Sequence, residues 1–230
     1  YTLKCKYFSG IAAKQNHYIC NMNDNKKPEF WDTAFIDRGE MWGLEPCNSA
    51  RLAKDFFIQH NVKTVLIPGA GYGRNAQLFI DSGMSVTGIE ISQTAIDMYL
   101  KHYSGGMKIY KGSVCDMPFD DKVYDAIFCH ALIHLLDEPE REKLIKNCYR
   151  QLAENGCMVF SAISKEAEVY GTGKFISKNR YEIIEGVKMY FYDKESVTAD
   201  FTKAGLIEIV DISEGSPFFL IKCIKKSGKT

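Results

Sequence analysis

The chain has 230 residues, of which 46% are hydrophobic and 25% are charged. This composition is that of a globular protein long enough to bury a real core, and one domain is the default at this length. Lys plus Arg and Asp plus Glu both number 29, so the chain lacks the basic balance that broad binding to nucleic acid or anionic membranes requires.

Periodicity predicts an N-terminal helical region followed by alternating strands and helices. Two helices are expected at 27–37 and 48–60, joined by a loop at 38–47. Strands are then expected at 62–67, 85–89, 107–111, 124–129 and 157–163, and helices at 74–82, 92–102 and 139–154. Alternating units of this length predict a parallel sheet covered on both faces.

The last quarter breaks this alternation. A helix at 194–204 is followed by strands at 207–212 and 218–225, and the short link 213–217 permits a hairpin but no crossover. The final strand must therefore run antiparallel. The sequence predicts an α/β fold, a doubly wound, seven-stranded, mostly parallel sheet with the last strand antiparallel. We expect a single domain over 1–230, divided into an N-terminal arm (1–61), a cofactor-binding core (62–163), a lid insertion (164–192) and a C-terminal helix with its hairpin (193–225).

Three glycines at alternate positions, Gly69, Gly71 and Gly73, follow the first predicted strand and precede a helix. Such a turn lets a nucleotide lie against main-chain atoms where a Cβ would collide. Glu90 ends the second strand about 20 residues later, where doubly wound folds place the carboxylate that binds both ribose hydroxyls. Dinucleotides and S-adenosylmethionine then compete as ligands. A dinucleotide loop has a glycine where this chain has Arg74.

These features resemble class I S-adenosylmethionine-dependent methyltransferases, which share a Rossmann-like seven-stranded sheet with an antiparallel last strand. The likeness covers roughly residues 45–225. The sequence of residues 66–74 is similar to that of the thiopurine methyltransferase and tellurite-resistance branch, which acts on small, often soft nucleophiles. By this resemblance the glycine turn holds the cofactor, 112–119 forms its adenine loop, and 124–135 is the fourth strand with its exit.

The resemblance implies a set of cofactor-binding residues: Trp42, Gly69, Ala70, Gly71, Gly73, Asn75, Glu90, Ile91, Ser113, Val114, Cys115, Asp116, Cys129 and His130. Trp42 corresponds to the tryptophan that packs beside the methyl end of the cofactor in that branch. Alternatively, Trp42 anchors the N-terminal arm by hydrophobic contacts alone. Two positions depart from the family pattern. Relatives carry acids where this chain has Ile67 and Ser113, which leaves Asp116 as a displaced substitute for the second acid.

The methyl acceptor needs alignment and exclusion of water more than it needs a catalytic triad. Where it must lose a proton, His130 is the first candidate for a base, because it directly follows the fourth strand. His134 is the second candidate, although packing or capping suits it better than catalysis. In the lid insertion, Tyr170, Tyr190 and Tyr192 could contact the substrate; alternatively, 189–192 is an extra strand that packs its aromatic side chains into the core.

The sequence has eight cysteines, no CxxC pair, no segment resembling a signal peptide and no apolar run that could span a bilayer. This pattern predicts reduced thiols, no metal site and a soluble, cytoplasmic protein. The hypothesis is methyl transfer from S-adenosylmethionine to a small molecule by a monomer or homodimer, with no nucleic-acid or membrane partner. A protein or peptide methyltransferase and a non-catalytic binder of S-adenosylmethionine or S-adenosylhomocysteine are the alternatives.

Overall fold

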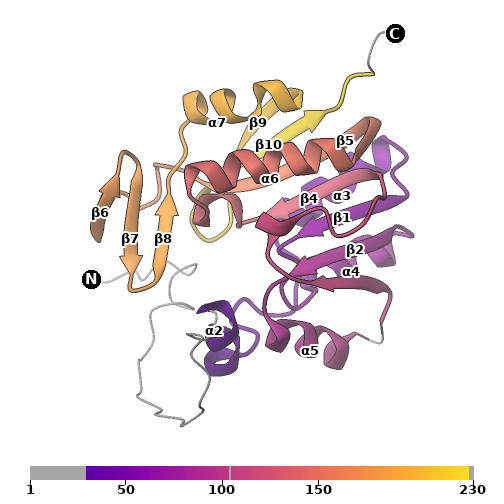
Figure 1. The fold of residues 1–230 in the computed structure, drawn as a ribbon, viewed down its shortest axis with the longest axis horizontal. Coiled ribbons are helices and arrows are strands. Elements are labelled where there is room, and N and C mark those ends of the chain that lie inside the picture. The colour runs from indigo at the N-terminus through magenta and orange to yellow at the C-terminus, as the bar shows by residue number, and fades with distance from the viewer. Residues whose placement is uncertain (1–29, 104, 228–230) are drawn as a thin grey trace.

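The structure, a computed structural model, describes residues 30–103 and 105–227. A seven-stranded sheet with the order β3-β2-β1-β4-β5-β10-β9 forms its centre (Figure 1). Its strands are β1 (Thr64–Pro68), β2 (Ser85–Glu90), β3 (Met107–Lys111), β4 (Tyr124–His130), β5 (Leu152–Ile163), β9 (Leu206–Ser213) and β10 (Pro217–Ile224). Strands β1 to β5 pair in parallel. Strand β10 is antiparallel to both of its neighbours, which confirms the predicted topology.

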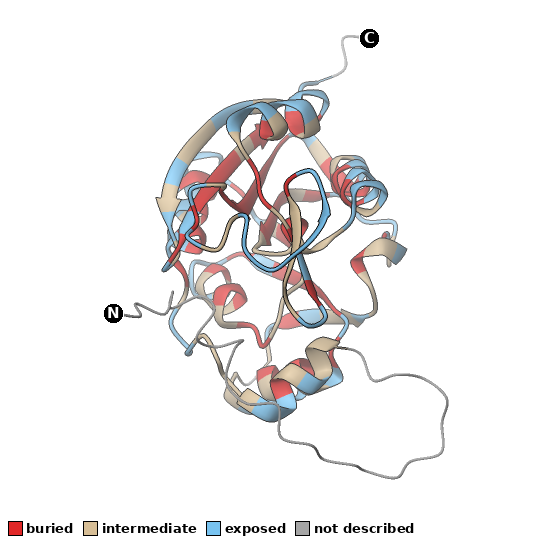
Figure 2. Cartoon of the chain, turned by 90° about the vertical axis from the view of Figure 1, so that its left-hand side faces the viewer, coloured by how far each residue is buried: buried red, intermediate tan, exposed pale blue. Residues whose placement is uncertain are grey.

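Helices cover both faces of this sheet. The helices of the described chain are α2 (Phe30–Arg38), α3 (Asn48–Gln59), α4 (Arg74–Asp81), α5 (Gln93–His102), α6 (Glu138–Gln151) and α7 (Lys194–Phe201). One face packs against α3 and α4 around Phe57 and Phe79, and the other packs against α6 and α7 around Leu144 and Phe201. All four side chains are fully buried. In Figure 2 the buried residues follow the central strands and the inward sides of the helices.

The predicted boundary between α6 and β5 differs from the observed one. Helix α6 ends at Gln151, earlier than the expected residue 154, and β5 already begins at Leu152. Asn155 has a positive φ of 60°, and the pairing of β4 with β5 shifts register between Tyr124 and Ala126. The Asn-Gly pair at 155–156 therefore forms an irregularity within the strand, where a turn between helix and strand was expected.

The insertion after β5 forms a second sheet of three antiparallel strands, β6 (Lys174–Ser177), β7 (Arg180–Ile184) and β8 (Val187–Tyr190). It stands to one side of the main sheet in Figure 1. Met189 and Phe191 are buried in its core, so 189–192 packs inward, as the second of the two sequence readings expected. The guanidinium of Arg180 donates to the carbonyl of Leu136 and fixes this small sheet beside the exit of β4.

The predicted helix at 27–37 corresponds to α2, and the part of it that precedes residue 30 lies outside the described residues. Asp32 ties α2 to the start of α5, because its Oδ1 accepts from the Ser92 hydroxyl at 2.7 Å and from the Thr94 amide at 2.9 Å. Among residues 30–103 and 105–227, no helix combines the length and apolarity that crossing a membrane would need.

Candidate functional site

The chain bends sharply between β1 and α4. Gly69, Gly71 and Gly73 have φ angles of 71°, 55° and 81°, a left-handed region that favours glycine. The amides of Gly69 and Ala70 donate to the carbonyl of Ile89 at 2.9 and 3.0 Å, which fixes the loop on the end of β2. A Cβ at Gly73 would lie 2.2 Å from the ring of Tyr99, so this glycine also permits the close approach of α5.

Glu90 ends β2 and is only 6% exposed. One carboxylate oxygen accepts from the Gly71 amide at 2.7 Å, and the other accepts from the Ser92 amide at 2.9 Å. A buried carboxylate is stable only where donors replace its lost hydration. Glu90 therefore holds the glycine loop and the start of α5 in fixed positions, and it lines the cavity described next.

These residues line a cavity of about 690 Å³ at the carboxyl edge of the sheet, a size typical of small-molecule sites. Of the residues predicted to bind the cofactor, the following line it: Trp42, Gly69, Ala70, Gly71, Asn75, Glu90, Ile91, Ser113, Val114 and His130. Segments from five parts of the chain thus meet where the sequence reasoning placed a ligand.

The other predicted cofactor residues, Gly73, Cys115, Asp116 and Cys129, do not line the cavity. Gly73 packs against Tyr99, and Cys129 is fully buried in the core, where burial raises the pKa of its thiol. Cys115 and Asp116 lie in a short 3-10 helix that begins at Val114. None of the four presents a side chain to the cavity, so their role in binding the cofactor stays a prediction.

The loop that carries Trp42 is fastened to the glycine turn. Arg74 donates to the carbonyls of Trp42 at 2.8 Å and Glu45 at 3.1 Å, and the Tyr72 hydroxyl donates to the carbonyl of Gly43 at 2.8 Å. The rings of Trp42 and Tyr72 are stacked with centroids 6.4 Å apart. Trp31 and Phe35 of α2 join them, and these aromatic side chains form one wall of the cavity.

At another part of the cavity, His130 is held between two serine hydroxyls. Its Nδ1 lies 2.9 Å from the Ser49 Oγ and 2.7 Å from the Ser161 Oγ. Burial lowers the pKa of His130 to about 4, against the opposing effect of Glu214, and Arg74 lowers it further. The ring is therefore neutral at neutral pH, and Nε2 takes no part in either of these hydrogen bonds.

Glu214 is a cavity residue that the sequence reasoning missed. It lies in the turn between β9 and β10 and accepts from the amides of Asn48 and Ser49, so it caps α3, whose own N-cap residue Cys47 supplies no side-chain cap. The predicted topology could have identified this residue. Because β9 runs parallel to β1 through β5, its carboxyl end reaches the ligand-binding edge, and the turn at 213–217 follows that end.

His134, the second predicted catalytic residue, does not line the cavity. Its side chain is fully enclosed, its Nδ1 accepts from the Ile163 amide at 3.4 Å, and its ring packs edge-on against Phe218. Burial, with a smaller contribution from His130, lowers the pKa of His134 to about 3. This environment is that of the packing role that the sequence analysis favoured for it.

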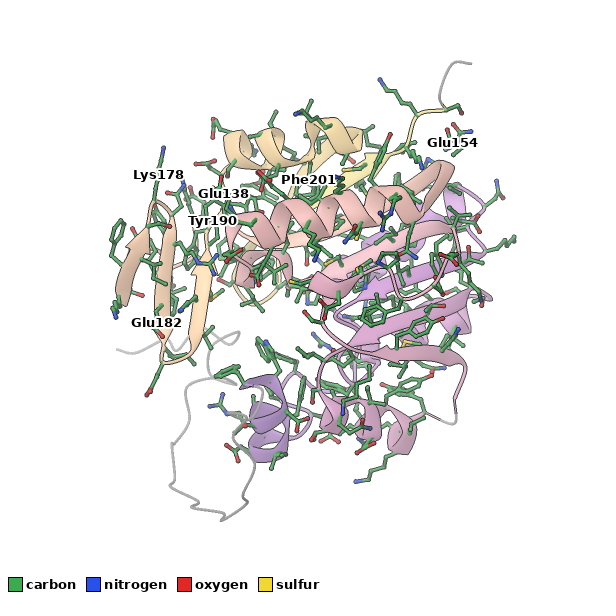
Figure 3. All side chains as sticks on the ribbon, in the orientation of Figure 1. Glu138, Glu154, Lys178, Glu182, Tyr190 and Phe201 are labelled. Atoms are coloured by element: carbon green, nitrogen blue, oxygen red, sulfur yellow. The ribbon has the colours of Figure 1, made fainter. Side chains whose placement is uncertain are left out.

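The three predicted substrate tyrosines also lie outside the cavity lining. Tyr192 is fully buried, and its hydroxyl donates to Asp200 at 3.0 Å. Tyr190 lies beside the start of α6 (Figure 3), with the guanidinium of Arg141 4.0 Å from its ring centroid. Tyr170 donates to Asn179 within the insertion. Leu132, Leu135 and Leu136 supply apolar cavity surface instead. The charged Glu140 lines the cavity as well.

The segment that forms much of the cavity is similar to a known protein family. Residues 66–160 match a family model described as a methyltransferase domain. This segment is therefore similar to a methyltransferase domain. It runs from β1 to β5 and so includes the glycine turn, Glu90 and His130. The family model does not distinguish the thiopurine methyltransferase and tellurite-resistance branch, so that assignment remains a prediction.

Two of the characterised relatives share about a quarter of their aligned residues with this chain. The ubiquinone biosynthesis O-methyltransferase of Coxiella burnetii is 27% identical over 150 residues, which cover 62% of this chain and 60% of the relative. The tRNA N(3)-methylcytidine methyltransferase Mettl2 of Drosophila melanogaster is 24% identical over 203 residues, covering 79% of this chain and 62% of the relative. The chain thus spans about three-fifths of the length of these relatives.

Solved structures share the fold of this chain. The Burkholderia thailandensis 1,6-didemethyltoxoflavin-N1-methyltransferase, with bound 1,6-didemethyltoxoflavin and S-adenosylhomocysteine, superposes with a TM-score of 0.67 at 14% identity over 86% of each chain. The glycopeptide N-methyltransferase MtfA superposes with a TM-score of 0.62 at 18% identity over 79% of this chain and 97% of MtfA. The fold is therefore the Rossmann-like fold of class I methyltransferases.

The glycine turn generates a prediction about stability. Gly73→Ala places a Cβ against the buried Tyr99 ring at a positive φ, and we expect it to lower the free energy of unfolding by about 2 kcal/mol or more. Gly71→Ala is the matched control, because its Cβ would meet nothing within 4 Å and only backbone strain of about 1 kcal/mol remains. Urea denaturation measures both; equal losses would contradict this account of the turn.

Proposed function

We propose that this chain transfers a methyl group from S-adenosylmethionine to a small-molecule nucleophile by in-line displacement. The match of residues 66–160 to a methyltransferase-domain model supports the reaction class. The observation that carries the proposal for the ligand is the buried Glu90 carboxylate, which lines the cavity and accepts from the Gly71 amide. A sulfonium cofactor supplies an activated methyl group when bound, so the protein has mainly to align the acceptor and exclude water.

The cavity residues fit such a nucleoside. Glu90 would accept hydrogen bonds from the ribose hydroxyls, and the bare backbone of Gly69 and Gly71 allows the ligand to approach the loop closely. Ser113 and Val114 line the region expected for the adenine. Trp42 and the aromatic side chains around it offer π-faces that attract a sulfonium by about 0.5 to 2 kcal/mol. A dinucleotide fits less well, because Arg74 replaces the third glycine of its loop.

The acceptor would bind at the part of the cavity lined by His130, Ala131 and the leucines that follow β4. His130 is the candidate for the group that takes a proton from the acceptor, since Ser49 and Ser161 hold its ring through Nδ1 and leave Nε2 for a bound molecule. His134 is enclosed away from the cavity, so we assign this role to His130 alone.

Two observations favour a small molecule over RNA as the acceptor. The chain is neutral overall, and the charged cavity residues are three carboxylates, Glu90, Glu140 and Glu214, with Arg74 as the cation. The guanidinium of Arg74 is committed to two backbone carbonyls. Phosphate backbones are bound by available cations, and the cavity offers few. The described cysteines are free thiols, in keeping with a cytoplasmic protein.

Loss of the Glu90 carboxylate should weaken binding of the cofactor. Charge-assisted hydrogen bonds contribute about 1.5 to 3 kcal/mol each, so we expect Glu90→Ala to raise the Kd of S-adenosylhomocysteine at least about 30-fold. Glu90→Gln keeps the size of the side chain and should also weaken binding, because its amide must present N–H groups to the Gly71 or Ser92 amide. Calorimetric titration with a thermal melt of each variant checks this; unchanged affinity in folded protein removes Glu90 from the site.

Turnover tests the reaction and its acceptor class together. Incubation with methyl-labelled S-adenosylmethionine and separate pools of thiols, amines, phenols, peptides and tRNA should label a small molecule, with at least a tenfold lower rate in His130→Ala at unchanged cofactor affinity. Label in peptide or tRNA would overturn the small-molecule assignment. Cofactor binding without label in any pool would favour the non-catalytic binder.

A further inference from the structure

Three side chains with metal-binding atoms converge at one wall of the cavity. Cys47 precedes α3, His130 ends β4, and Glu214 lies in the turn between β9 and β10. One ligand atom from each, the thiol sulfur, an imidazole nitrogen and a carboxylate oxygen, lies within 4.8 Å of the other two. All three residues line the cavity, and Cys47 is only 7% exposed. We propose that Cys47, His130 and Glu214 bind a zinc ion.

The ligand set selects the metal. A thiolate and an imidazole suit Zn²⁺ rather than the hard cations Mg²⁺ and Ca²⁺, and carboxylates also bind Zn²⁺. Three protein ligands are the number that zinc has where its fourth coordination position stays open to water or a bound molecule. Because the three residues line the cavity, that open position can face into it and take a sulfur or oxygen donor atom from a molecule bound there.

The surroundings of the three side chains support the assignment. A metal-bound histidine usually donates its second ring N–H to a nearby oxygen, and such contacts orient the ligands. The hydroxyls of Ser49 and Ser161 lie at hydrogen-bond distance from Nδ1 of His130 and fix its ring, and the Ser49 hydroxyl also lies 3.2 Å from the Cys47 sulfur. The amides of Asn48 and Ser49 fix the Glu214 carboxylate in the same way.

Spacing along the chain gave no sign of this site. No metal site was expected, because the sequence has no CxxC pair and none of the usual spacings of metal ligands. Here each ligand comes from a different segment, and only the parallel course of β4 and β9, with α3 packed against the sheet, brings the three together. The zinc site shares His130 with the proposed function, and a His130 nitrogen that binds zinc cannot also take a proton, so bound zinc would replace the role of that nitrogen as a base.

Zinc titration of the 230-residue chain, stripped of metal with a chelator, tests the proposal. We expect about one Zn²⁺ per chain by calorimetry, and with Co²⁺ as the probe a thiolate-to-metal absorption band. Cys47→Ala, His130→Ala and Glu214→Gln should each weaken Zn²⁺ binding at least about tenfold, and the first should abolish the Co²⁺ band. Cys115→Ser, a half-buried thiol outside the cluster, and Glu140→Gln, another cavity carboxylate, are matched controls that should bind Zn²⁺ as the parent does.

The absence of stoichiometric Zn²⁺ binding by the parent would overturn the proposal. So would Cys47→Ala with unchanged affinity, or an equal loss in Cys115→Ser. Glu214→Gln retains an oxygen that can cap α3, and thermal melts show that each variant is folded. The affinity for S-adenosylhomocysteine, measured on the same samples without zinc, separates failure of the zinc site from failure of the proposed function.

Discussion

The hydrogen bond from the Gly71 amide to the Glu90 carboxylate joins the two turns on which the cavity depends. It connects the loop after β1 to the end of β2, and the second carboxylate oxygen extends the link to the start of α5. A buried charge of this kind is stable only with its donors in place, so the loop geometry and the ionised carboxylate require each other. The same arrangement places a carboxylate in the lining of a cavity large enough for a nucleoside.

The N-terminal arm completes the cavity through a second set of contacts. Arg74 and Tyr72, which belong to the glycine turn itself, hold the backbone around Trp42, and Asp32 fixes α2 on α5. The aromatic wall is therefore attached to the loop that it faces. This attachment also explains the departure from the dinucleotide pattern, because the side chain at position 74 is used to hold the arm where a dinucleotide loop has a glycine.

Periodicity and topology made much of the fold predictable. The glycine spacing, Glu90 at the end of a strand and the short link at 213–217 each reflect local constraints on the backbone. The predicted seven-stranded sheet with an antiparallel last strand was confirmed, whereas the predicted start of β5 was wrong. Contacts between distant segments were not predictable in the same way. The link from Glu214 to the start of α3 joins residues separated by 165 positions, and no sequence period encodes such a pairing.

The insertion shows a second limit. Its tyrosines predicted either a lid over a substrate or a packed strand, because an aromatic residue serves both purposes equally well. Burial of Met189, Phe191 and Tyr192 favours packing, and the leucines after β4 line the cavity where the tyrosines were expected. The apolar character of these residues predicts that they are buried against something, but it does not tell whether the partner is a substrate or the protein core.

Competitive calorimetry with two nucleotides tests the central claim most directly. The account predicts that S-adenosylhomocysteine binds the full chain at about one molecule per chain and that NAD⁺ neither binds nor displaces it. Binding of NAD⁺ in place of S-adenosylhomocysteine, or no binding of S-adenosylhomocysteine by folded protein, would contradict it.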